Sequence, residues 1–424
     1  MTSWKAPTVN YPINATVNLP ASKSLTNRYL VLAALASSPS TISNFLVARD
    51  AKLMIQALKN LGASITENDN SLNITPSFNE NDVTIDCGLA GTVMRFVPLI
   101  AVFRNGNTTF TGDAEAKIRP MSTTLTSLEK LGIKVTRHNS EFLPFTVHGS
   151  GKITTDKINI DASASSQFIS ALLLIGARCQ NGLEIEHTGT NLPSKPLISM
   201  TVNTLRDLGI GVTELSNTSW KVQPGKISGF EQTVEPDLAN ATPFVAAAMA
   251  TNGSVKIPFW PKTSNQPGFH LPQLMEQFGG KASFDDEQQQ MSFCGPKILK
   301  APNTIDLTAY GELVPNIAAL SLLANTKIKI TGIGHLRGHE TDRINALATE
   351  FNKLGGTVIE HDTSLEFNKS ELHSTEFLSY KDHRMATTGA IIGLKVPDIS
   401  IENIETVSKT MPDFTKMWEE MIKR

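Results

Sequence analysis

The sequence predicts an α/β protein with two domains, each an inside-out α/β barrel made of three repeats of a mixed βαβαββ unit with buried helices. The main reason is a fixed period along the chain. A helical segment that ends in Leu-Gly or Phe-Gly recurs every 70 to 77 residues, at Leu61, Leu131, Leu208, Phe278 and Leu354. Such a period is typical of a chain built from repeated structural units. A sixth helix of this kind is predicted at 418–422.

A second helical segment in each unit is rich in Ala and Leu and apolar on every side, which predicts burial on every side. These segments span 29–36, 96–103, 168–177, 244–250, 317–324 and 386–394. A short β-like run follows each of them, as at 183–187 and 254–258. Another run, in which apolar and polar residues alternate, follows each Leu-Gly. The Gly ends the preceding helix by adopting a left-handed conformation. Parallel and antiparallel strands are therefore both expected.

Six buried helices in 424 residues are more than one hydrophobic core of ordinary size can hold. This predicts two domains of three units each. The first domain is expected at 20–234. The second is expected to combine 235–424 with 1–19, where a strand within 8–18 would complete it. The chain would then cross between domains twice, near Pro20 and Pro236.

The composition is that of a soluble globular protein, with 40% hydrophobic and 18% charged residues. A net charge of −2 predicts no general affinity for nucleic acid or anionic membranes, so any anion site must be local. The three cysteines lack metal-type spacing, which predicts structural thiols in a reducing compartment. The N-terminus lacks an apolar signal region and no apolar run is long enough for a bilayer. We therefore expect a cytoplasmic protein.

The starts of the predicted helices are candidate anion sites, because free backbone N–H groups there attract anions. Cations recur at these starts although the helix dipole disfavours them, which indicates a role in binding. They are Lys23, Arg119, Lys195, Arg343, Arg384 and Lys409. Gly88 and Gly91 would let the backbone approach a ligand closely. The hydroxyls of 163–166 suit a phosphate, although they also suit an ordinary helix cap.

Several of these helix starts resemble motifs of one enzyme family and occur in the same order along the chain. The resemblance covers essentially the whole chain. The family is enolpyruvylshikimate-phosphate synthase (EPSP synthase, 3-phosphoshikimate 1-carboxyvinyltransferase). The matching segments are 20–24 (PASKS), 90–95 (AGTVMR), 165–167 (SSQ), 339–343 (HETDR) and 382–385 (DHRM). The resemblance implies transfer of the enolpyruvyl group of phosphoenolpyruvate to the 5-hydroxyl of shikimate 3-phosphate by addition and elimination, with release of phosphate. It also implies a monomer in the shikimate pathway to chorismate and aromatic amino acids, without metal or cofactor.

The same resemblance assigns roles to individual residues. It places shikimate 3-phosphate mainly on the first domain and phosphoenolpyruvate on the second, with Lys23 as a catalytic group that contacts both. Shikimate 3-phosphate is expected at Lys23, Ser24, Arg28, Ser165, Ser166, Gln167, Ser194, Glu312 and His339. Phosphoenolpyruvate is expected at Lys23, Gly91, Arg119, Gln167, Arg343, Arg384 and Lys409. Arginine suits these sites because its planar fork binds phosphate and carboxylate with two parallel hydrogen bonds.

The chain departs from the common family pattern at four positions. Asn316 stands where many members have the Asp expected to be the general base, and an amide cannot take up a proton at neutral pH. We predict that Glu312, near the same helix start, is the base. His339 replaces a frequent Lys, Leu197 a frequent Tyr and Leu89 a frequent Asn.

Two alternatives remain open at the level of sequence. One is the related enzyme family that transfers enolpyruvyl to a UDP-linked amino sugar, which usually has Lys-Asn at Lys23-Ser24 and a reactive Cys in a mobile loop. Neither Cys87 nor Cys179 resembles that loop. The other is a phosphometabolite-binding protein without turnover, which only Asn316 favours.

Overall fold

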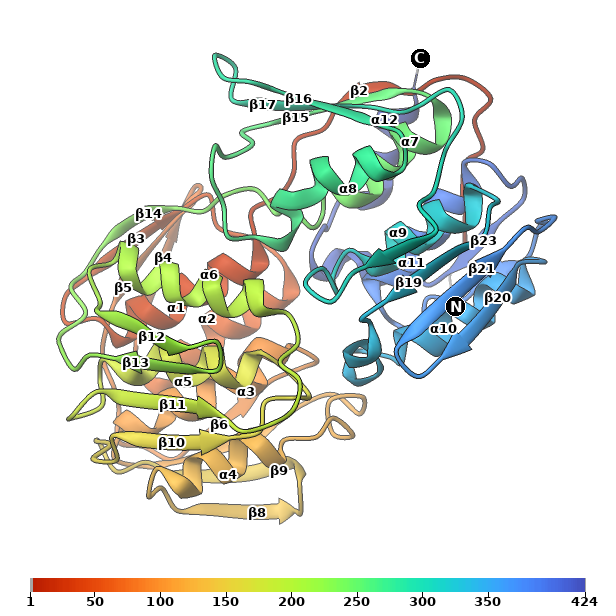
Figure 1. Cartoon of the computed structure of the whole chain (residues 1–424). Coiled ribbons are helices and arrows are strands. Elements are labelled where there is room, and N and C mark those ends of the chain that lie inside the picture. The colour runs from red at the N-terminus through yellow and green to blue at the C-terminus, as the bar shows by residue number, and fades with distance from the viewer. Residues whose placement is uncertain (1–2, 424) are drawn as a thin grey trace. The chain divides into compact units, whose positions relative to one another are not determined.

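The computed structural model describes residues 3–423, and the chain divides into two compact units. The central unit is Ala21–Val234. The terminal unit combines Met1–Pro20 with Glu235–Arg424. Figure 1 shows the helices and strands of the chain. Each unit has its own buried apolar cluster, so each is held together by a separate core.

The core of the central unit forms around three helices that contact one another in pairs: α1 (Lys23–Leu35), α3 (Gly91–Ile100) and α5 (Gln167–Gly176). Almost every residue of these helices is buried, as their uniformly apolar sequences predict. Ser22 caps α1, because its side chain accepts a hydrogen bond from the backbone N–H of Leu25. The side chain of Ser22 thus fixes the start of α1.

Three four-stranded sheets belong to the central unit, and all have one topology. In each, the first two strands are parallel and the last two form an antiparallel hairpin. The first sheet is β14 (Glu231–Thr233), β3 (Ser40–Ser43), β5 (Ser71–Thr75) and β4 (Ser64–Asn68). The second is β6 (Val83–Asp86), β7 (Asn107–Thr111), β9 (Phe142–His148) and β8 (Val135–Asn139). The third is β10 (Lys157–Ile160), β11 (Leu183–His187), β13 (Ser219–Val222) and β12 (Val212–Ser216).

The remaining helices of the central unit are amphipathic: α2 (Arg49–Leu61), α4 (Ser122–Lys130) and α6 (Lys195–Asp207). Each ends close to a glycine with positive φ, namely Gly62, Gly132 and Gly209. Such a conformation favours glycine because it has no Cβ, which explains the recurrent Leu-Gly pattern. The hairpin of the next two strands follows directly, as the sequence predicts.

The terminal unit is built in the same manner around three mutually contacting buried helices: α7 (Thr242–Thr251), α9 (Val314–Leu323) and α11 (His383–Gly393). Its amphipathic helices are α8 (Leu271–Gln277), α10 (Arg343–Lys353) and α12 (Phe414–Ile422). One four-stranded sheet is β16 (Lys281–Asp285), β17 (Gln290–Cys294), β15 (Ser254–Pro258) and β2 (Asn14–Thr16). The other is β18 (Thr304–Asp306), β19 (Ile328–Thr331), β21 (Ser364–Asn368) and β20 (Thr357–His361).

The N-terminal segment contributes two short strands to the terminal unit. The strand β2 pairs in parallel with β15, which confirms a strand within 8–18, although it covers only three of those residues. The strand β1 (Ser3–Lys5) was not predicted. It pairs antiparallel with β23 (Ser400–Glu402), which is also parallel to β22 (Glu376–Phe377).

Two of the predicted helix starts are wrong. Arg119 lies in the loop before α4, and Lys409 ends a short 3-10 segment, η4 (Ile404–Lys409), that precedes α12. The prolines at 120 and 412 explain the error, because a proline often opens a helix but here stands before each helix start.

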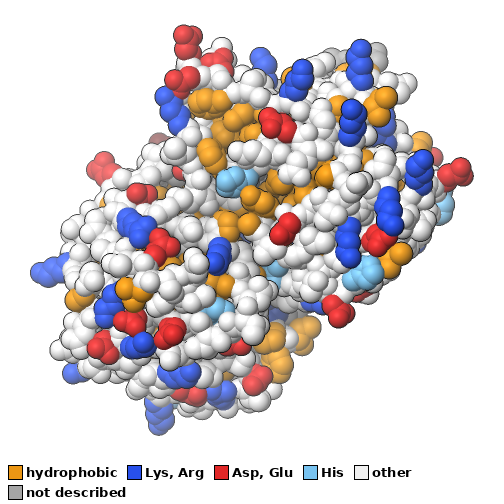
Figure 2. Space-filling view, viewed as in Figure 1, with side chains coloured by type: hydrophobic (Ala, Val, Ile, Leu, Met, Phe, Trp, Pro, Cys, Tyr) orange, Lys and Arg blue, Asp and Glu red, His pale blue; other side chains and the backbone are white. Residues whose placement is uncertain are grey.

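On the face shown in Figure 2, lysine and arginine side chains are interspersed with aspartate and glutamate. Among the described residues, no helix is long and apolar enough to cross a bilayer.

Candidate functional site

The first candidate residues of the central unit stand at the start of α1. Lys23 is its first residue, and its Nζ lies 3.7 Å from Oδ2 of the buried Asp50. Ser24 follows and is partly exposed. The carboxylate of Asp50 fixes the Lys23 ammonium group at a helix start, where the dipole alone would disfavour a cation.

Arg28 lies one turn further along α1 and is only 2% exposed. Its Nε donates to Oγ1 of Thr201 (2.8 Å) and its Nη1 to the carbonyl of Ser24 (2.9 Å). Its Nη2 donates to the carbonyl of Leu197 (3.0 Å) and to Oγ of Ser170 (3.4 Å). Burial lowers the pKa of Arg28 to about 10, so the guanidinium remains charged at neutral pH. Four of its five N–H groups are used, and the side chain joins α1 to the start of α6.

A second group surrounds the start of α3. Gly91 is the first residue of the helix, and a Cβ there would lie 3.3 Å from Nη2 of Arg119 and 3.3 Å from Oε1 of Gln167. Nη1 of Arg95 donates to that same Oε1 at 2.7 Å. Nη1 of Arg119 donates to the carbonyl of Leu89 at 3.3 Å. The structure thus brings Gly91, Arg119 and Gln167 together, as the resemblance implies, and adds Arg95.

The predicted serines lie at the starts of α5 and α6. The Oγ of Ser165 accepts a hydrogen bond from the backbone N–H of Gln167 (3.3 Å), and Ser166, the N-cap residue of α5, is 3% exposed. Ser194 caps α6 with φ of 51°, a left-handed conformation that a serine seldom adopts. The backbone of that cap is therefore strained, as it often is at functional sites.

The candidate residues of the terminal unit converge on the carboxylate of Glu312. Its Oε2 lies 3.4 Å from Nε of Arg384 and 3.6 Å from Nη1 of Arg343, and its Oε1 lies 3.8 Å from Nδ1 of His339. The two arginines are buried, while 30% of the Glu312 side chain is exposed. Burial and the charge of Arg343 lower the pKa of His339, so the imidazole is neutral at pH 7.

Both arginines are held by groups that stand just before helices, Asp382 before α11 and Asn240 before α7. Arg343 donates to both oxygens of Asp382, from Nε at 2.7 Å and from Nη2 at 3.2 Å. Arg384 donates from Nη1 to Oδ1 of Asn240 at 3.0 Å. Although burial opposes it, the carboxylate of Asp382 raises the pKa of Arg343 above its usual value. Nη1 of Arg343 has no hydrogen-bond partner among residues 3–423, so a fixed, buried donor faces Glu312.

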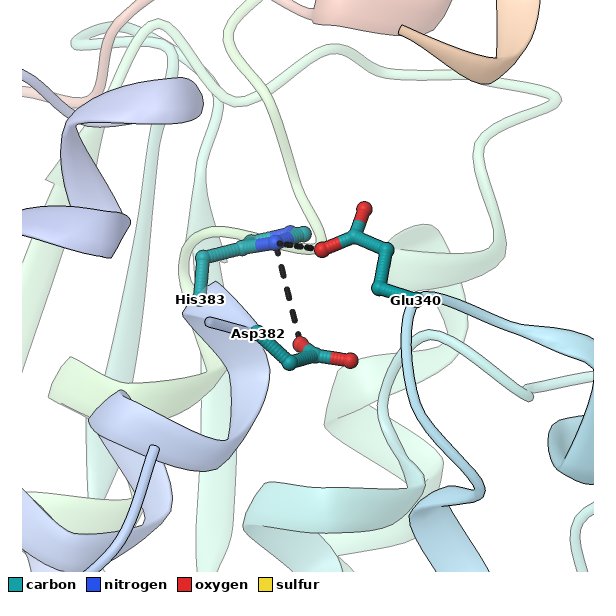
Figure 3. A group of neighbouring side chains, drawn as sticks. All are labelled: Glu340, Asp382 and His383. Atoms are coloured by element: carbon teal, nitrogen blue, oxygen red, sulfur yellow. Dashed lines mark hydrogen bonds and ion pairs between the residues drawn. The ribbon is translucent and has the colours of Figure 1, made fainter. Parts of the chain in front are cut away.

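A further cluster joins Glu340, Asp382 and His383 (Figure 3). Nδ1 of His383 lies 3.2 Å from Oε2 of Glu340 and 3.8 Å from Oδ1 of Asp382. Lys409 donates to the other oxygen of Glu340. Although burial acts in the opposite direction, Lys409 and His383 hold the pKa of Glu340 well below its usual range.

By distance alone, those three side chains could hold a metal ion, since their ligand atoms lie within 4.8 Å of one another. Their carboxylates, however, already have cationic partners: Asp382 is bound by Arg343 and Glu340 by Lys409. A divalent cation would have to displace both partners. The donor set therefore suits a hydrogen-bond network beside an anion site better than a metal centre.

Asn316 and Glu312 differ sharply in their surroundings. Asn316 is completely buried, and its Oδ1 accepts hydrogen bonds from Thr387 (3.0 Å) and Thr388 (3.2 Å) of α11. It joins α9 to α11, whereas Glu312 lies just before α9 with a partly exposed carboxylate. Of the two, only Glu312 can both accept a proton and reach a ligand.

Several residues of these clusters were not predicted: Arg95, Asn240, Glu340, Asp382 and His383. Glu340, Asp382 and His383 belong to the motifs 339–343 and 382–385, so their positions were visible although their partners were not. Arg95 likewise ends the motif 90–95. Asn240 stands at one of the predicted helix starts, but its contact with Arg384 joins positions 144 residues apart, so no local pattern indicated that contact.

Known proteins that are similar to this chain belong mainly to one enzyme family. The profile of EPSP synthase (3-phosphoshikimate 1-carboxyvinyltransferase) matches residues 8–418. A 3-phosphoshikimate 1-carboxyvinyltransferase of Kocuria rhizophila is 45% identical over 431 aligned residues, which cover 99% of this chain and 96% of that protein. An EPSP synthase structure from Acinetobacter baumannii superposes with a TM-score of 0.79 at 20% identity, covering 99% of this chain and 98% of that chain. The enolpyruvyl transferase NikO from Streptomyces tendae gives a TM-score of 0.76 at 16% identity, with 99% and 97% covered. The chain belongs to the EPSP synthase family.

Proposed function

We propose that this chain is a 3-phosphoshikimate 1-carboxyvinyltransferase, which transfers the enolpyruvyl group of phosphoenolpyruvate to the 5-hydroxyl of shikimate 3-phosphate with release of phosphate. Membership of the family supports the activity. The observation that carries the proposal at the level of residues is the position of Glu312. Its partly exposed carboxylate stands beside two buried arginines, so one group can accept a proton where others can bind an anion.

Phosphoenolpyruvate would bind the cations of both units. Arg343, Arg384 and Lys409 supply them in the terminal unit, and Arg119 in the central unit, with Lys23 contacting both substrates. Gly91 would let the backbone approach the ligand closely, and Gln167 would add its side-chain amide. Nη1 of Arg343 supports this assignment, because it has no hydrogen-bond acceptor within residues 3–423 and a buried donor is costly until an acceptor satisfies it.

Shikimate 3-phosphate would bind mainly to the central unit, through hydroxyl groups at helix starts. Ser165, Ser166 and Ser194 would hold its phosphate, where the helix dipoles favour an anion. Lys23, Ser24, Arg28 and Gln167 complete this set, with Glu312 and His339 from the terminal unit. The neutral His339 would act as a hydrogen-bond partner and contribute no charge.

The addition and the elimination each require two proton transfers. In the addition step, Glu312 takes the proton of the 5-hydroxyl as the hydroxyl oxygen bonds to C2 of phosphoenolpyruvate, and the ammonium group of Lys23 gives a proton to the methylene carbon. The product is a tetrahedral intermediate that carries both phosphate and the new ether. Elimination breaks the bond from C2 to the phosphate oxygen: the methyl group returns a proton to the neutral Lys23 amine to regenerate the double bond, and Glu312 gives its proton to the departing phosphate. Lys23 would assist these transfers, since it is held by Asp50 at the start of α1.

We further propose that each unit is an inside-out α/β barrel of three βαβαββ repeats. The common strand topology of the four-stranded sheets supports this, as do the three mutually contacting buried helices of each unit. The repeats would explain why the proposed site residues are dispersed from Lys23 to Lys409, because each repeat contributes a helix start. In this proposal 20–234 and 235–424 with 1–19 are the two domains.

The rival activity on a UDP-linked amino sugar is not favoured by the family match. Two of the three thiols, those of Cys87 and Cys179, are buried and do not suit a reactive cysteine of that kind, whereas Cys294 is exposed at the end of β17. Burial raises the pKa of Cys87 above its usual range and that of Cys179 to about 12, so neither forms a thiolate readily. The non-catalytic alternative rested on Asn316 alone, and Glu312 offers a carboxylate in its place.

Phosphate release with both substrates tests the activity directly. Release that requires shikimate 3-phosphate together with phosphoenolpyruvate is expected. Release with a UDP-amino sugar, or with neither acceptor, would contradict the proposal. We also propose a cytoplasmic monomer; light scattering coupled to size exclusion would contradict the monomer by giving a multiple of 46.0 kDa.

A further inference from the structure

Arg95 is a buried cation of the central unit to which no role in binding has been assigned above. It lies on α3, is 6% exposed, and has its guanidinium carbon 5.2 Å from the centre of the Phe168 ring. Its Nη1 donates to Oε1 of Gln167 at 2.7 Å. Gln167 and Phe168 open α5, so one guanidinium contacts two successive residues of a helix start.

The contact determines which way the amide of Gln167 is turned. A side-chain amide has a carbonyl oxygen that accepts and an NH₂ group that donates, whereas a guanidinium only donates. The oxygen must therefore face Arg95, and the NH₂ group is left for other partners. Stacking on Phe168 restrains the guanidinium itself, because a cation over an aromatic face is attracted to it.

This pair lies at the start of α3, close to the proposed phosphoenolpyruvate residues. A Cβ on Gly91 would lie 3.4 Å from Nη1 of Arg95 and 3.3 Å from Oε1 of Gln167. Arg119 approaches the same position at 3.3 Å. Burial and the neighbouring charge of Arg119 lower the pKa of Arg95 to about 9, which still leaves it charged at neutral pH.

We propose that Arg95 is a positioning residue for Gln167: it holds the amide oxygen, so that the NH₂ group is presented as a hydrogen-bond donor to the anionic substrates. The inference rests on the proposed binding role of Gln167. With Arg95 removed, the amide can rotate and turn its oxygen toward an anion, which is repulsive. Arg95 would thus act on affinity through Gln167 without contacting a substrate.

A double-mutant cycle on the full-length protein tests this. Arg95→Met is expected to raise the KM for phosphoenolpyruvate and for shikimate 3-phosphate about tenfold when Gln167 is present, as for a lost hydrogen bond to a charged group. In a Gln167→Ala background the same change is expected to raise each KM by less than about twofold, because the group it positions is gone. Equal effects in both backgrounds would overturn the positioning role.

Gln167→Glu adds an independent test. A carboxylate keeps Arg95 as its partner but has no N–H to donate, so we expect the thermal midpoint to be retained and both KM values to rise. Binding like that of the wild type would overturn the inference. If instead Gln167→Ala leaves both KM values unchanged, the binding role of Gln167 fails, and that result is distinct from additivity in the cycle.

A matched control is Arg104→Lys. Arg104 is another buried arginine of the central unit, 1% exposed, which donates to Asn79 and Thr108 away from α5. The control is expected to lower the thermal midpoint without changing either KM. Should Arg95→Met fail to fold, Arg95→Lys replaces it in the cycle, with a smaller KM increase that again depends on Gln167. If Arg104→Lys raised both KM values as much as Arg95→Lys, the KM effect would reflect stability, and the inference would be wrong.

Discussion

Oε2 of Glu312 lies 3.6 Å from Nη1 of Arg343, a buried nitrogen without a hydrogen-bond partner among residues 3–423. A carboxylate that precedes α9 and a buried guanidinium N–H group at the start of α10 thus lie close together. In a low-dielectric site, such proximity lets a bound anion and a proton transfer influence each other strongly. The predictions below test this arrangement and its supports.

Replacing the proposed base should abolish most of the turnover. Glu312→Gln keeps the size of the side chain but cannot take up a proton, so kcat should fall about 100-fold or more. Phosphate release at saturating substrates measures this. Glu287→Gln, on an exposed turn, is the control and should keep full activity. A kcat near that of the wild type would show that another group is the base.

A carboxylate at position 316, which many family members have, should not raise the activity of this chain. Asn316→Asp would place a carboxylate in a fully buried position where Thr387 and Thr388 already donate to the existing oxygen. Burying a charge is costly, so we expect a lower thermal midpoint. Activity of the double variant Glu312→Gln with Asn316→Asp should stay low. Recovery of kcat in that variant would contradict the distinction drawn between the two positions.

Gly91→Ala should weaken phosphoenolpyruvate binding more than it weakens folding. The new Cβ would lie 3.3 Å from Arg119 and 3.3 Å from Gln167, so one of those side chains must shift. We expect the KM for phosphoenolpyruvate to rise several-fold, and the sensitivity to inhibitors that mimic it to fall, in a dose-response assay. Gly225→Ala is the control, because a Cβ at Gly225 would meet nothing within 4 Å. Unchanged KM and sensitivity for Gly91→Ala would contradict the proposed position of the ligand.

The buried ion pair between Arg343 and Asp382 should be important for stability as well as for binding. Asp382→Asn would leave the Arg343 charge without its partner inside the protein, which costs about 3–5 kcal/mol. The midpoint of urea unfolding should fall accordingly. Asp398→Asn removes the acid of a solvent-exposed pair with Lys5 and should leave the midpoint unchanged. Equal midpoints for both variants would show that the buried pair contributes little.

Stability should fall when the pH is lowered from about 7 toward 5. Burial lowers the pKa of His383 in the folded protein, although Glu340 opposes this. The unfolded chain, with a histidine pKa of about 6.5, then binds more protons than the folded chain, so acid favours unfolding. The loss of stability begins as the pH falls below the pKa of the histidine in the unfolded chain. It grows until the pH reaches the lower pKa of His383 in the folded protein. Urea midpoints at pH 7.5 and 5.5 measure the loss.

The matched variants for that measurement are His383→Gln and His373→Gln. His383→Gln removes the titrating group and should make the midpoint less dependent on pH. His373 is exposed, and its replacement should leave the dependence as in the wild type. An unaltered pH dependence in His383→Gln would assign the effect to other groups.

The sequence alone was sufficient for most of the secondary structure. The buried helices, such as α5 and α7, were predictable because a helix that is apolar on every side must be buried on every side. The strands β11 and β15 were predicted with their observed bounds, because each follows such a helix directly. The strand β1 was missed because a three-residue strand has too short a pattern, and its pairing with β23 spans almost the whole chain.

The residues of the candidate site were visible in the sequence, but their partners were not. Motifs marked Arg343, Arg384 and Gln167, because residues close in sequence carry a recognisable local pattern. Only the tertiary structure decided that Asp382 binds Arg343, that Arg95 contacts the amide oxygen of Gln167, and that the Glu312 side chain is partly exposed while Asn316 is buried. The physical reason is that burial and hydrogen bonding between distant helices depend on how the helices pack, which no local pattern records.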